Sequence, residues 1–335
     1  MTQPTASSVR TAKLPTAKLP TAKLPTAKLP TASIAPAARA QVELLPRTPG
    51  VYRFRAETGR VLYVGRATNL RSRVGSYWGS LRDRPRLRRM MALVTSLEAV
   101  PCQSVHEAAW LERNLLERAR PAWNRVRGGL EVPVWIRIEP ARGGSGPRLR
   151  VVHTAQDGDV GPYLGGDATR HAVAAIERVH ALGYTGELRS GSEREMARVR
   201  GVGESAEVSD AVGRVLRGEP SAMSDLRQRL VELRGAAAAS LAFELAAKIQ
   251  AEIEALEWIA QPQRVTGATD VRLDLHGWCD GVHVSFEVRA GKVERWTSEP
   301  ATHESVTKRL AATPPEWRPF VDDAAALAAR LRPTA

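Results

Sequence analysis

Cysteine is nearly absent from this 335-residue chain, which contains only Cys102 and Cys279. Two cysteines so far apart in sequence exclude a disulfide framework and a cysteine-rich metal cluster, and they suit a reducing cytoplasm. Long hydrophobic runs are also missing, because no stretch reaches the roughly 18 apolar residues of a membrane span. The proline-rich N-terminus lacks the apolar segment of a secretory signal. We therefore expect a cytoplasmic protein that uses no membrane.

Acidic residues are outnumbered in the chain, with 36 against 49 lysines and arginines and a formal net charge of +13. Arginine-rich proteins that bind no nucleic acid are common, but such a charge favours a polyanionic partner, and we expect DNA. The densest basic cluster is opposed by Asp83 alone. Its candidate DNA contacts are Arg71, Arg82, Arg84, Arg86, Arg88 and Arg89.

Residues 1–40 contain no acid, and Thr11–Pro30 consists of four copies of T-A-K-L-P. A proline at every fifth position removes backbone donors, and the period is too short for a repeat unit with its own core. We predict a disordered, extended basic tail. Two interpretations stay open: the tail holds DNA electrostatically, or it is a repeat expansion without function.

The segment 41–128 predicts a small α+β unit that contains a β-hairpin. Asn69 is the expected N-cap of one helix, and Ser104 with Glu107 forms a capping box for another. The expected strands are Val51–Arg55, Val61–Val64 and Leu97–Cys102, and the expected helices are 69–77, 87–95 and 104–119.

Three further regions are expected after residue 128. In the middle region, 129–220, we predict strands Val134–Ile138 and Leu149–Val152, a helix Ala168–His180 capped by Asp167, and a loop at 183–203. Residues 221–260 predict a helical hairpin with a turn or tight contact near Gly235. Residues 261–335 predict a β-rich unit that ends in a helix. Its expected elements are strands 271–275, 282–289 and 293–296 and the helix 324–331, and Asp270, Asp274 and Asp280 are assigned to strand and turn surface.

Chemistry-bearing side chains recur along the predicted unit 41–128. The hairpin carries Tyr52 and Tyr63, the next helix carries Arg73, and a later helix carries Glu112. Two strand tyrosines are ordinary by themselves. A phenol, a guanidinium and a carboxylate on one surface would, however, form a site for phosphodiester hydrolysis with a hard cation.

Several motifs in order resemble the GIY-YIG nuclease family, and most closely the N-terminal half of UvrC. The two defining motifs read Gly50-Val51-Tyr52 and Tyr63-Val64-Gly65. The resemblance continues through Arg66–Tyr77, L-E-R-N-L-L at Leu111–Leu116 and R-P-A-W-N at Arg120–Asn124. It implies that the α+β unit is a GIY-YIG nuclease domain.

The resemblance also implies a role for each matching residue. Glu112 is the expected sole protein ligand of one divalent ion, Mg²⁺ or Mn²⁺. Arg73 is expected to act on the scissile phosphate, although a contact that only positions the DNA backbone is the alternative. Tyr63 is expected to activate water, with Tyr52 orienting it. The expected supporting residues are Tyr77 and Asn124.

One position departs from the family, which usually has lysine where this chain has Arg66. Arginine keeps the positive charge and can favour the phenolate of Tyr63, but it cannot give up a proton. We therefore predict an active site that cuts more slowly, or with a different pH dependence, than a lysine version.

The later regions resemble UvrC as well. Leu233–Leu256 is similar to the UVR motif, a helical hairpin that binds UvrB, and Leu241, Phe243 and Glu244 are the expected partner-binding residues. A stripe that packs inside the protein is the alternative. Residues 182–202 lack the cysteines that hold an iron–sulfur cluster in many relatives, so no such cluster is expected.

These features together predict a DNA-repair endonuclease that resembles Cho, the shortened UvrC relative. We expect no RNase H-like domain of the kind that UvrC carries. By resemblance, it cuts one strand, 3′ to a lesion, in nucleotide excision repair. A non-catalytic adaptor that binds DNA and a UvrB-like protein is the alternative, and a DnaQ-like exonuclease is a further expected partner in trans.

Overall fold

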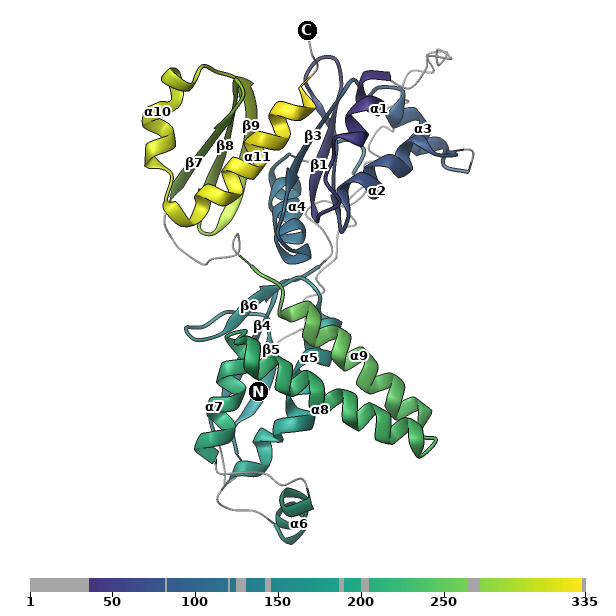
Figure 1. Ribbon diagram of the computed structural model, residues 1–335, viewed down its shortest axis with the longest axis vertical. Helices are drawn as coiled ribbons and strands as arrows, with labels where there is room; N and C mark the ends of the chain where they lie inside the picture. Colours follow the sequence, from purple (N-terminus) through teal and green to yellow (C-terminus); the bar gives the residue numbers. More distant parts are fainter. Residues whose placement is uncertain are drawn as a thin grey trace, which may run out of the picture. The chain divides into compact units, whose positions relative to one another are not determined.

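The structure is a computed structural model that describes residues 36–81, 83–119, 121–124, 131–141, 146–186, 190–199, 205–263 and 272–332 (Figure 1). Arg82, Arg120 and the T-A-K-L-P repeats lie outside the described residues. Helix α1 (Pro36–Glu43) begins before Gln41, where we expected order to begin, so the predicted tail extended too far. Every helix in the described ranges is too short or too polar to cross a membrane.

The first sheet has the order β2-β1-β3, with β1 (Gly50–Arg55) between β2 (Val61–Ala67) and β3 (Ser96–Pro101). All of its pairings are antiparallel, which confirms the predicted hairpin and third strand. The central strand is buried on both faces because side chains alternate across a strand. Val51 enters a core shared with helix α4 (Val105–Ala119), whereas Tyr52 and Phe54 enter a second core on the opposite face.

The helices of this unit follow the expected capping signals. Asn69 accepts a hydrogen bond from the backbone N–H of Ser72, 2.9 Å away, at the start of α2 (Leu70–Gly75). Ser104 accepts from the N–H of Glu107 at 3.2 Å, while Glu107 accepts from the N–H of Gln103, one residue before the expected donor. The short helices η1 (Ser76–Trp78) and α3 (Pro85–Met91) complete the unit. Residues 92–95, which we expected to extend α3, lie outside it.

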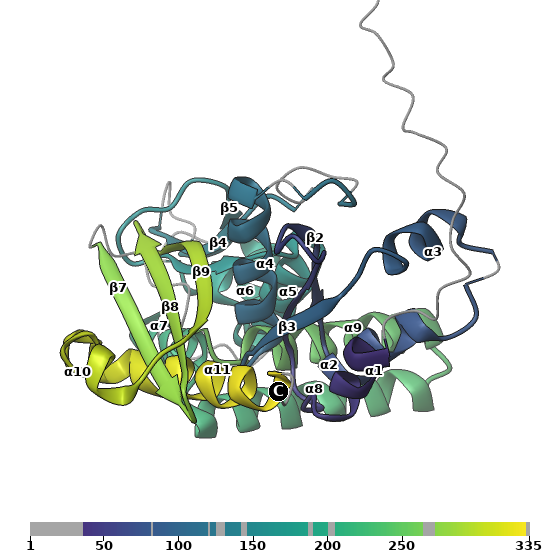
Figure 2. The ribbon, with the colours of Figure 1, turned by 90° about the horizontal axis from the view of Figure 1, so that it is seen from above.

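The C-terminal sheet is the predicted β-meander, in the order β7-β8-β9. Its strands are β7 (Leu273–Cys279), β8 (Val282–Arg289) and β9 (Lys292–Pro300). We did not predict helix α10 (His303–Ala312), and helix α11 (Arg318–Leu331) begins earlier than expected. Helix α11 packs against both β7 and β3 (Figures 1 and 2). Its Leu327 and Leu331 join the core that contains Tyr52.

The middle region contains a sheet of order β5-β4-β6, which consists of β4 (Val134–Glu139), β5 (Arg148–Val152) and β6 (Val160–Tyr163). Helix α5 (Gly166–His180) begins after Gly165, so the predicted Asp167 cap is wrong; Asp167 lies in the first turn. The expected loop at 183–203 is also wrong, because it contains η2 (Leu182–Thr185) and α6 (Gly191–Val199). Helix α7 (Ser205–Leu216) follows.

The helical hairpin consists of α8 (Pro220–Ala239) and α9 (Phe243–Ile259). The turn lies at 240–242 and not near Gly235, which is inside α8 with open space beside its Cα. Leu241 has a φ of 59°, in the left-handed region that residues other than glycine rarely adopt. The predicted hairpin is confirmed, with its turn displaced toward α9.

Candidate active site

Three tyrosines come together from β1, β2 and η1. The hydroxyls of Tyr52 and Tyr77 lie 2.7 Å apart, and the ring centroids of Tyr63 lie 6.2 Å from those of Tyr52 and Tyr77. Tyr52 and Tyr77 are buried, whereas Tyr63 is half-buried and lines a hollow in the surface. Tyr63 is therefore the phenol of this cluster that can contact a ligand, and the other two position it.

The glycines of the two motifs make this packing possible. Gly65 lies opposite Tyr52 in the hairpin register, and a Cβ at Gly65 would lie 2.6 Å from the Tyr52 hydroxyl. A Cβ at Gly50 would lie 2.5 Å from the carbonyl oxygen of Val100 on the neighbouring strand. Such distances are shorter than any ordinary carbon–oxygen contact, so both positions need a residue without a side chain.

Burial raises the pKa of Tyr63 above its ordinary value, and the neighbouring Tyr77 raises it further. Arg73 opposes this rise because a positive charge favours phenolate. The Arg73 guanidinium lies 5.6 Å from the centroid of the Tyr77 ring. In the protein alone Tyr63 is thus a neutral phenol, which donates one hydrogen bond and accepts others.

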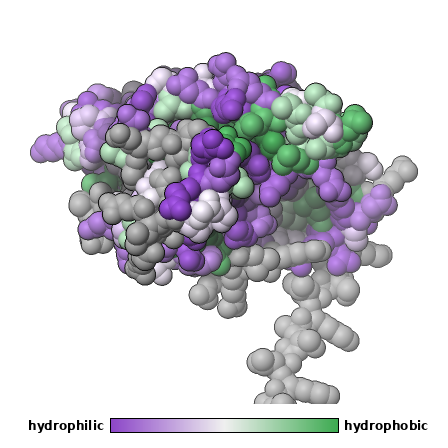
Figure 3. Space-filling model, turned by 90° about the horizontal axis from the view of Figure 1, so that it is seen from below, coloured by the Kyte–Doolittle hydropathy of each residue, from purple (hydrophilic) through white to green (hydrophobic). Residues whose placement is uncertain are grey.

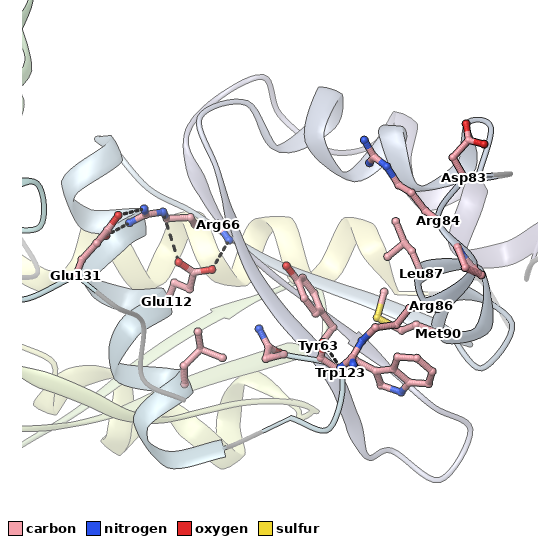
Figure 4. Close-up of a pocket in the computed structure, with 13 residues that line it drawn as sticks. Tyr63, Arg66, Asp83, Arg84, Arg86, Leu87, Met90, Glu112, Trp123 and Glu131 are labelled. Carbon is pink, nitrogen blue, oxygen red and sulfur yellow. Dashed lines mark hydrogen bonds and ion pairs between the residues drawn. The ribbon is translucent and has the colours of Figure 1, made fainter. Parts of the chain in front are cut away.

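Glu112, on α4, has a largely buried carboxylate that faces Arg66 on β2 (Figure 4). It accepts a hydrogen bond from the backbone N–H of Arg66 at 3.2 Å, and the Arg66 Nε lies 3.5 Å away. Burial raises the pKa of Glu112, and the attraction of Arg66 only partly opposes this.

Arg66 is held between two carboxylates. Its two terminal nitrogens donate to Glu131 at 3.0 and 2.8 Å, in a bidentate pair, while its Nε faces Glu112. We expected Arg66 to favour the phenolate of Tyr63. The structure corrects this, because the guanidinium is directed at Glu131 and Glu112 and the pKa of Tyr63 is raised. Sequence reasoning missed Glu131, which has no motif of its own.

The chemistry of Glu112 fits one divalent cation. The described part of the chain contains no group of three or more histidine, cysteine, aspartate or glutamate side chains that could form a metal cage. The pKa of Glu112 is raised because Arg66 and Arg73 only partly offset the burial of its carboxylate, and a cation would supply further positive charge. One carboxylate with water at the other positions suits Mg²⁺, which dehydrates reluctantly.

Two hollows meet at Tyr63, Arg66 and Glu112, which line both. One, of about 690 Å³, also contains the exposed Arg73. It is lined in addition by His106, Leu164, Trp258 and Gln261, none of which we predicted. The other, of about 670 Å³, extends along α3. The structure thus brings Tyr63, Arg73 and Glu112 to one surface, with Tyr52 buried behind them.

His106 links the first hollow to the end of α9. Its Nε2 lies 2.6 Å from the carbonyl oxygen of Trp258, and its ring packs edge-on against the Trp258 ring, with centroids 4.3 Å apart. Burial lowers the pKa of His106. The position of His106 beside the Ser104 capping box was the only sequence signal that could have placed it near this surface.

Asn124 and Arg71 make contacts within the protein. The Asn124 side-chain oxygen accepts from the Val64 N–H at 3.1 Å, and its amide donates to the Val64 carbonyl at 2.8 Å. Asn124 therefore pairs with the free edge of β2 while it lines the second hollow. The Nε of Arg71 donates to the carbonyl oxygen of Leu45 at 2.8 Å. Arg71 is thus partly committed to holding α2 against the preceding loop.

The remaining candidate DNA contacts among the described residues lie on or beside α3. Arg84 is the N-cap residue of that helix. The exposed members of this group are Arg84, Arg86, Arg88 and Arg89. Of these, Arg84 and Arg86 line the second hollow.

The tip of the α8–α9 hairpin exposes the predicted partner-binding residues. Leu241 and Phe243 are 73% and 65% exposed, and Glu244 is exposed beside them. Ile249, two turns after Leu241 along the helical hairpin, is instead 2% exposed and packs inside the protein. Hydrophobic residues gather on the surface over this tip (upper right in Figure 3). The stripe is thus divided between an internal part and an unpartnered tip.

Residues 48–125 match the family model of the UvrC-like GIY-YIG domain. The UvrABC system protein C of Natronomonas pharaonis is 30% identical over 316 residues, which are 84% of this chain and 52% of that protein. The protein of the same name from Syntrophomonas wolfei is 29% identical over 76% of this chain and 45% of its own length. The chain spans about half the length of these relatives.

A solved GIY-YIG N-terminal endonuclease domain of UvrC from Thermotoga maritima, described as bound to its catalytic magnesium, is 31% identical to this chain. The match covers 97% of that domain and 27% of this chain, with a TM-score of 0.25.

Proposed function

Since the chain belongs to the UvrC-like GIY-YIG family through residues 48–125, we propose that it is a DNA endonuclease of nucleotide excision repair. The observation that carries this proposal is the convergence of Tyr63, Arg73 and Glu112 on one hollow. A carboxylate, a phenol and a guanidinium around one cavity supply what phosphodiester hydrolysis needs. These are charge neutralisation at the phosphate, a cation site and an oriented water molecule.

Each side chain has a defined task in this proposal. Glu112 would hold Mg²⁺ or Mn²⁺, which when bound neutralises phosphate charge and lowers the pKa of bound water. The exposed guanidinium of Arg73 neutralises the charge that grows on the non-bridging phosphate oxygens. The Tyr63 phenol accepts a hydrogen bond from the attacking water and so aims its lone pair at phosphorus. The water oxygen forms the new bond to phosphorus as the bond to the 3′ oxygen breaks. The water gives up one proton to solvent and the leaving 3′ oxygen takes one from solvent, so the products are a 3′-hydroxyl and a 5′-phosphate.

The task of Tyr63 follows from its raised pKa. A neutral phenol orients water more readily than it removes a proton at neutral pH. Tyr52 and Tyr77 position that phenol without contacting the substrate. Arg66, paired with Glu131, supports the Glu112 carboxylate from the side away from Tyr63.

The finer parts of the proposal concern the setting of the reaction. We propose that the cut is made 3′ to a lesion, in the cytoplasm, after recruitment by a UvrB-like protein. The exposed Leu241 and Phe243 at the hairpin tip support this recruitment, because an apolar tip that the fold does not cover suits a partner protein. A DnaQ-like exonuclease in trans stays a prediction from the sequence.

A duplex with one bulky adduct tests the function. The purified chain is incubated with this duplex and Mg²⁺, with and without UvrA and UvrB, and single-strand products are mapped. We expect one incision 3′ to the adduct, dependent on UvrB and lost in Glu112→Gln. Binding of the duplex and UvrB without any incision would instead identify the non-catalytic adaptor, which the exposed hairpin tip alone would equally support.

A further inference from the structure

The hollow along α3 has two chemically different ends. Leu87, Met90 and Trp123 line one end, and Arg66, Glu112 and Glu131 line the other. Figure 4 shows these groups on opposite sides of Tyr63. Tyr63, Arg66 and Glu112 also line the hollow that contains Arg73, so the two hollows share these residues. The apolar end therefore lies next to the proposed reaction site, on the other side of Tyr63.

The indole ring of Trp123 forms a flat surface at the apolar end, beside the guanidinium of Arg86. Trp123 is half-buried, and its backbone N–H donates to the carbonyl oxygen of Leu62 at 3.3 Å. The Arg86 guanidinium carbon lies 5.7 Å from the centroid of the Trp123 ring. One Arg86 nitrogen lies 3.5 and 3.4 Å from the carbonyl oxygens of Ala122 and Trp123. An aromatic face flanked by a planar guanidinium is the usual platform on which nucleobases stack.

The charges around the hollow favour a base over a phosphate at this end. The guanidinium of Arg66, at the other end of the hollow, is already paired with Glu112 and Glu131, so its positive charge is balanced within the protein and does not attract a phosphate. At the apolar end the Arg86 guanidinium already lies near the carbonyl oxygens of Ala122 and Trp123, and the side chains of Leu87 and Met90 offer a phosphate no hydrogen-bond donor. A flat and partly apolar ring suits them, and a hollow of about 670 Å³ is large enough for one. The exposed Arg84 at the edge suits a neighbouring backbone phosphate.

We propose that the hollow bounded by Leu87, Met90 and Trp123 holds one unstacked nucleobase of the strand that is cut, adjacent to the scissile phosphate. This inference rests on the proposed nuclease function and names how that site selects its substrate. A base must leave the helical stack to enter, and this costs least where the duplex is already distorted or single-stranded. The hollow therefore favours damaged or opened DNA over intact duplex.

The test compares two single strands of equal length and charge, in EDTA so that no cutting occurs. One is an oligothymidylate, and the other is the same sugar–phosphate chain without bases. Electrostatic binding by the basic tail and by the exposed arginines is equal for both. We expect the wild-type protein to bind the strand with bases about tenfold more tightly, the usual effect of one stacked base.

Variants of Trp123 locate that preference. Trp123→Ala should remove most of it, and Trp123→Phe should restore it, because phenylalanine keeps a stacking face. The control Trp317→Ala changes a half-buried tryptophan in the C-terminal unit and should leave the preference unchanged. An unchanged preference in a folded Trp123→Ala overturns the proposal, as does equal binding of both strands by the wild type.

A measurement on the unaltered protein guards against misfolding of the variants. A strand that contains 5-iodouracil is photo-crosslinked to the wild type, and the modified peptide is identified by mass spectrometry. We expect the crosslink on the peptide that contains Trp123, and crosslinks confined to other peptides contradict the proposal. If the wild-type protein prefers the strand with bases but does not nick DNA at an adduct, only the nuclease function is rejected. Nicking without the preference rejects only the base pocket.

Discussion

The tyrosine cluster and the hairpin tip both present aromatic side chains, but the protein supports them in opposite ways. Tyr52 and Tyr77 are buried and hydrogen-bonded, and Gly65 leaves no room for a methyl group beside them. Phe243 is 65% exposed, and Gly235 in the same hairpin has open space around it. The cluster works through a geometry that the core enforces, whereas the tip keeps hydrophobic surface that the fold does not use.

The largest expected effect is the loss of cutting in Glu112→Gln. Removing the negative charge removes the cation site, and we expect the nicking rate in Mg²⁺ to fall by about a thousandfold, since such a cation supplies several kcal/mol. The matched control is Glu117→Gln on the same helix, where Glu117 forms surface ion pairs with Arg113 and Lys292. Exposed pairs contribute little, so the control should cut normally. Cutting by Glu112→Gln at the wild-type rate would remove Glu112 from the mechanism.

The same substitution should have opposite signs in the two regions. Gly65→Ala places a methyl group against the Tyr52 hydroxyl and should lower the free energy of unfolding by about 1–3 kcal/mol, as overpacking does. Gly235→Ala lies in a helix with free space and should raise it by about 0.5–1 kcal/mol. Urea denaturation measures both. Changes of the same sign would show that the two regions are not built differently.

A smaller effect is expected from the double change Leu241→Gly with Phe243→Ala. Glycine relieves the left-handed backbone at 241, so the fold should keep its stability, while the lost apolar tip should weaken UvrB binding by about tenfold or more. Affinity is measured by calorimetric titration with UvrB. The control is Val199→Ala, which changes an apolar residue outside the hairpin that is 72% exposed. This variant should bind UvrB with unchanged affinity. Unchanged affinity in the double variant would leave the tip without a partner role.

The smallest expected effect concerns pH. Burial raises the pKa of Glu112, and only the ionised carboxylate can hold the cation, so nicking should decline as the pH falls through this raised pKa. Arg66 opposes the rise; Arg66→Gln should therefore move the decline to higher pH, by less than about one unit. Arg66→Lys keeps the charge and should move it less. A decline that shifts to lower pH in Arg66→Gln contradicts this arrangement, and pH–rate profiles distinguish the outcomes.

Local signals predicted the parts of the site that depend on neighbouring residues. Each of these signals depends on residues a few positions apart, and the structure contains all of them. They are the alternation of side chains in β1 and β2, the Asn69 cap and the Ser104 cap. Gly235 suggested a turn or a tight contact, but in the structure helix α8 continues past that residue to Ala239, and Gly235 has open space beside it.

Contacts between distant residues could not be predicted in this way. Arg66 and Glu131 are separated by 65 positions, and no local pattern marks Glu131 as a partner. The sequence therefore pointed to Tyr63 as the neighbour of the Arg66 guanidinium. His106 and Trp258 both line the hollow that contains Arg73, and they contact each other although they are 152 positions apart in the sequence. Neither segment alone predicts this contact.

Helix α11 has a consequence for when the proposed catalytic side chains become packed in place during synthesis. Every proposed catalytic side chain precedes residue 128, yet Leu327 and Leu331 of α11 fill the core in which Tyr52 and Tyr77 are packed. A ribosome that has translated the motifs has not yet made the helix that encloses them. The core around Tyr52 and Tyr77 is completed by α11, so an interrupted translation product would carry the proposed catalytic residues without part of the packing around them.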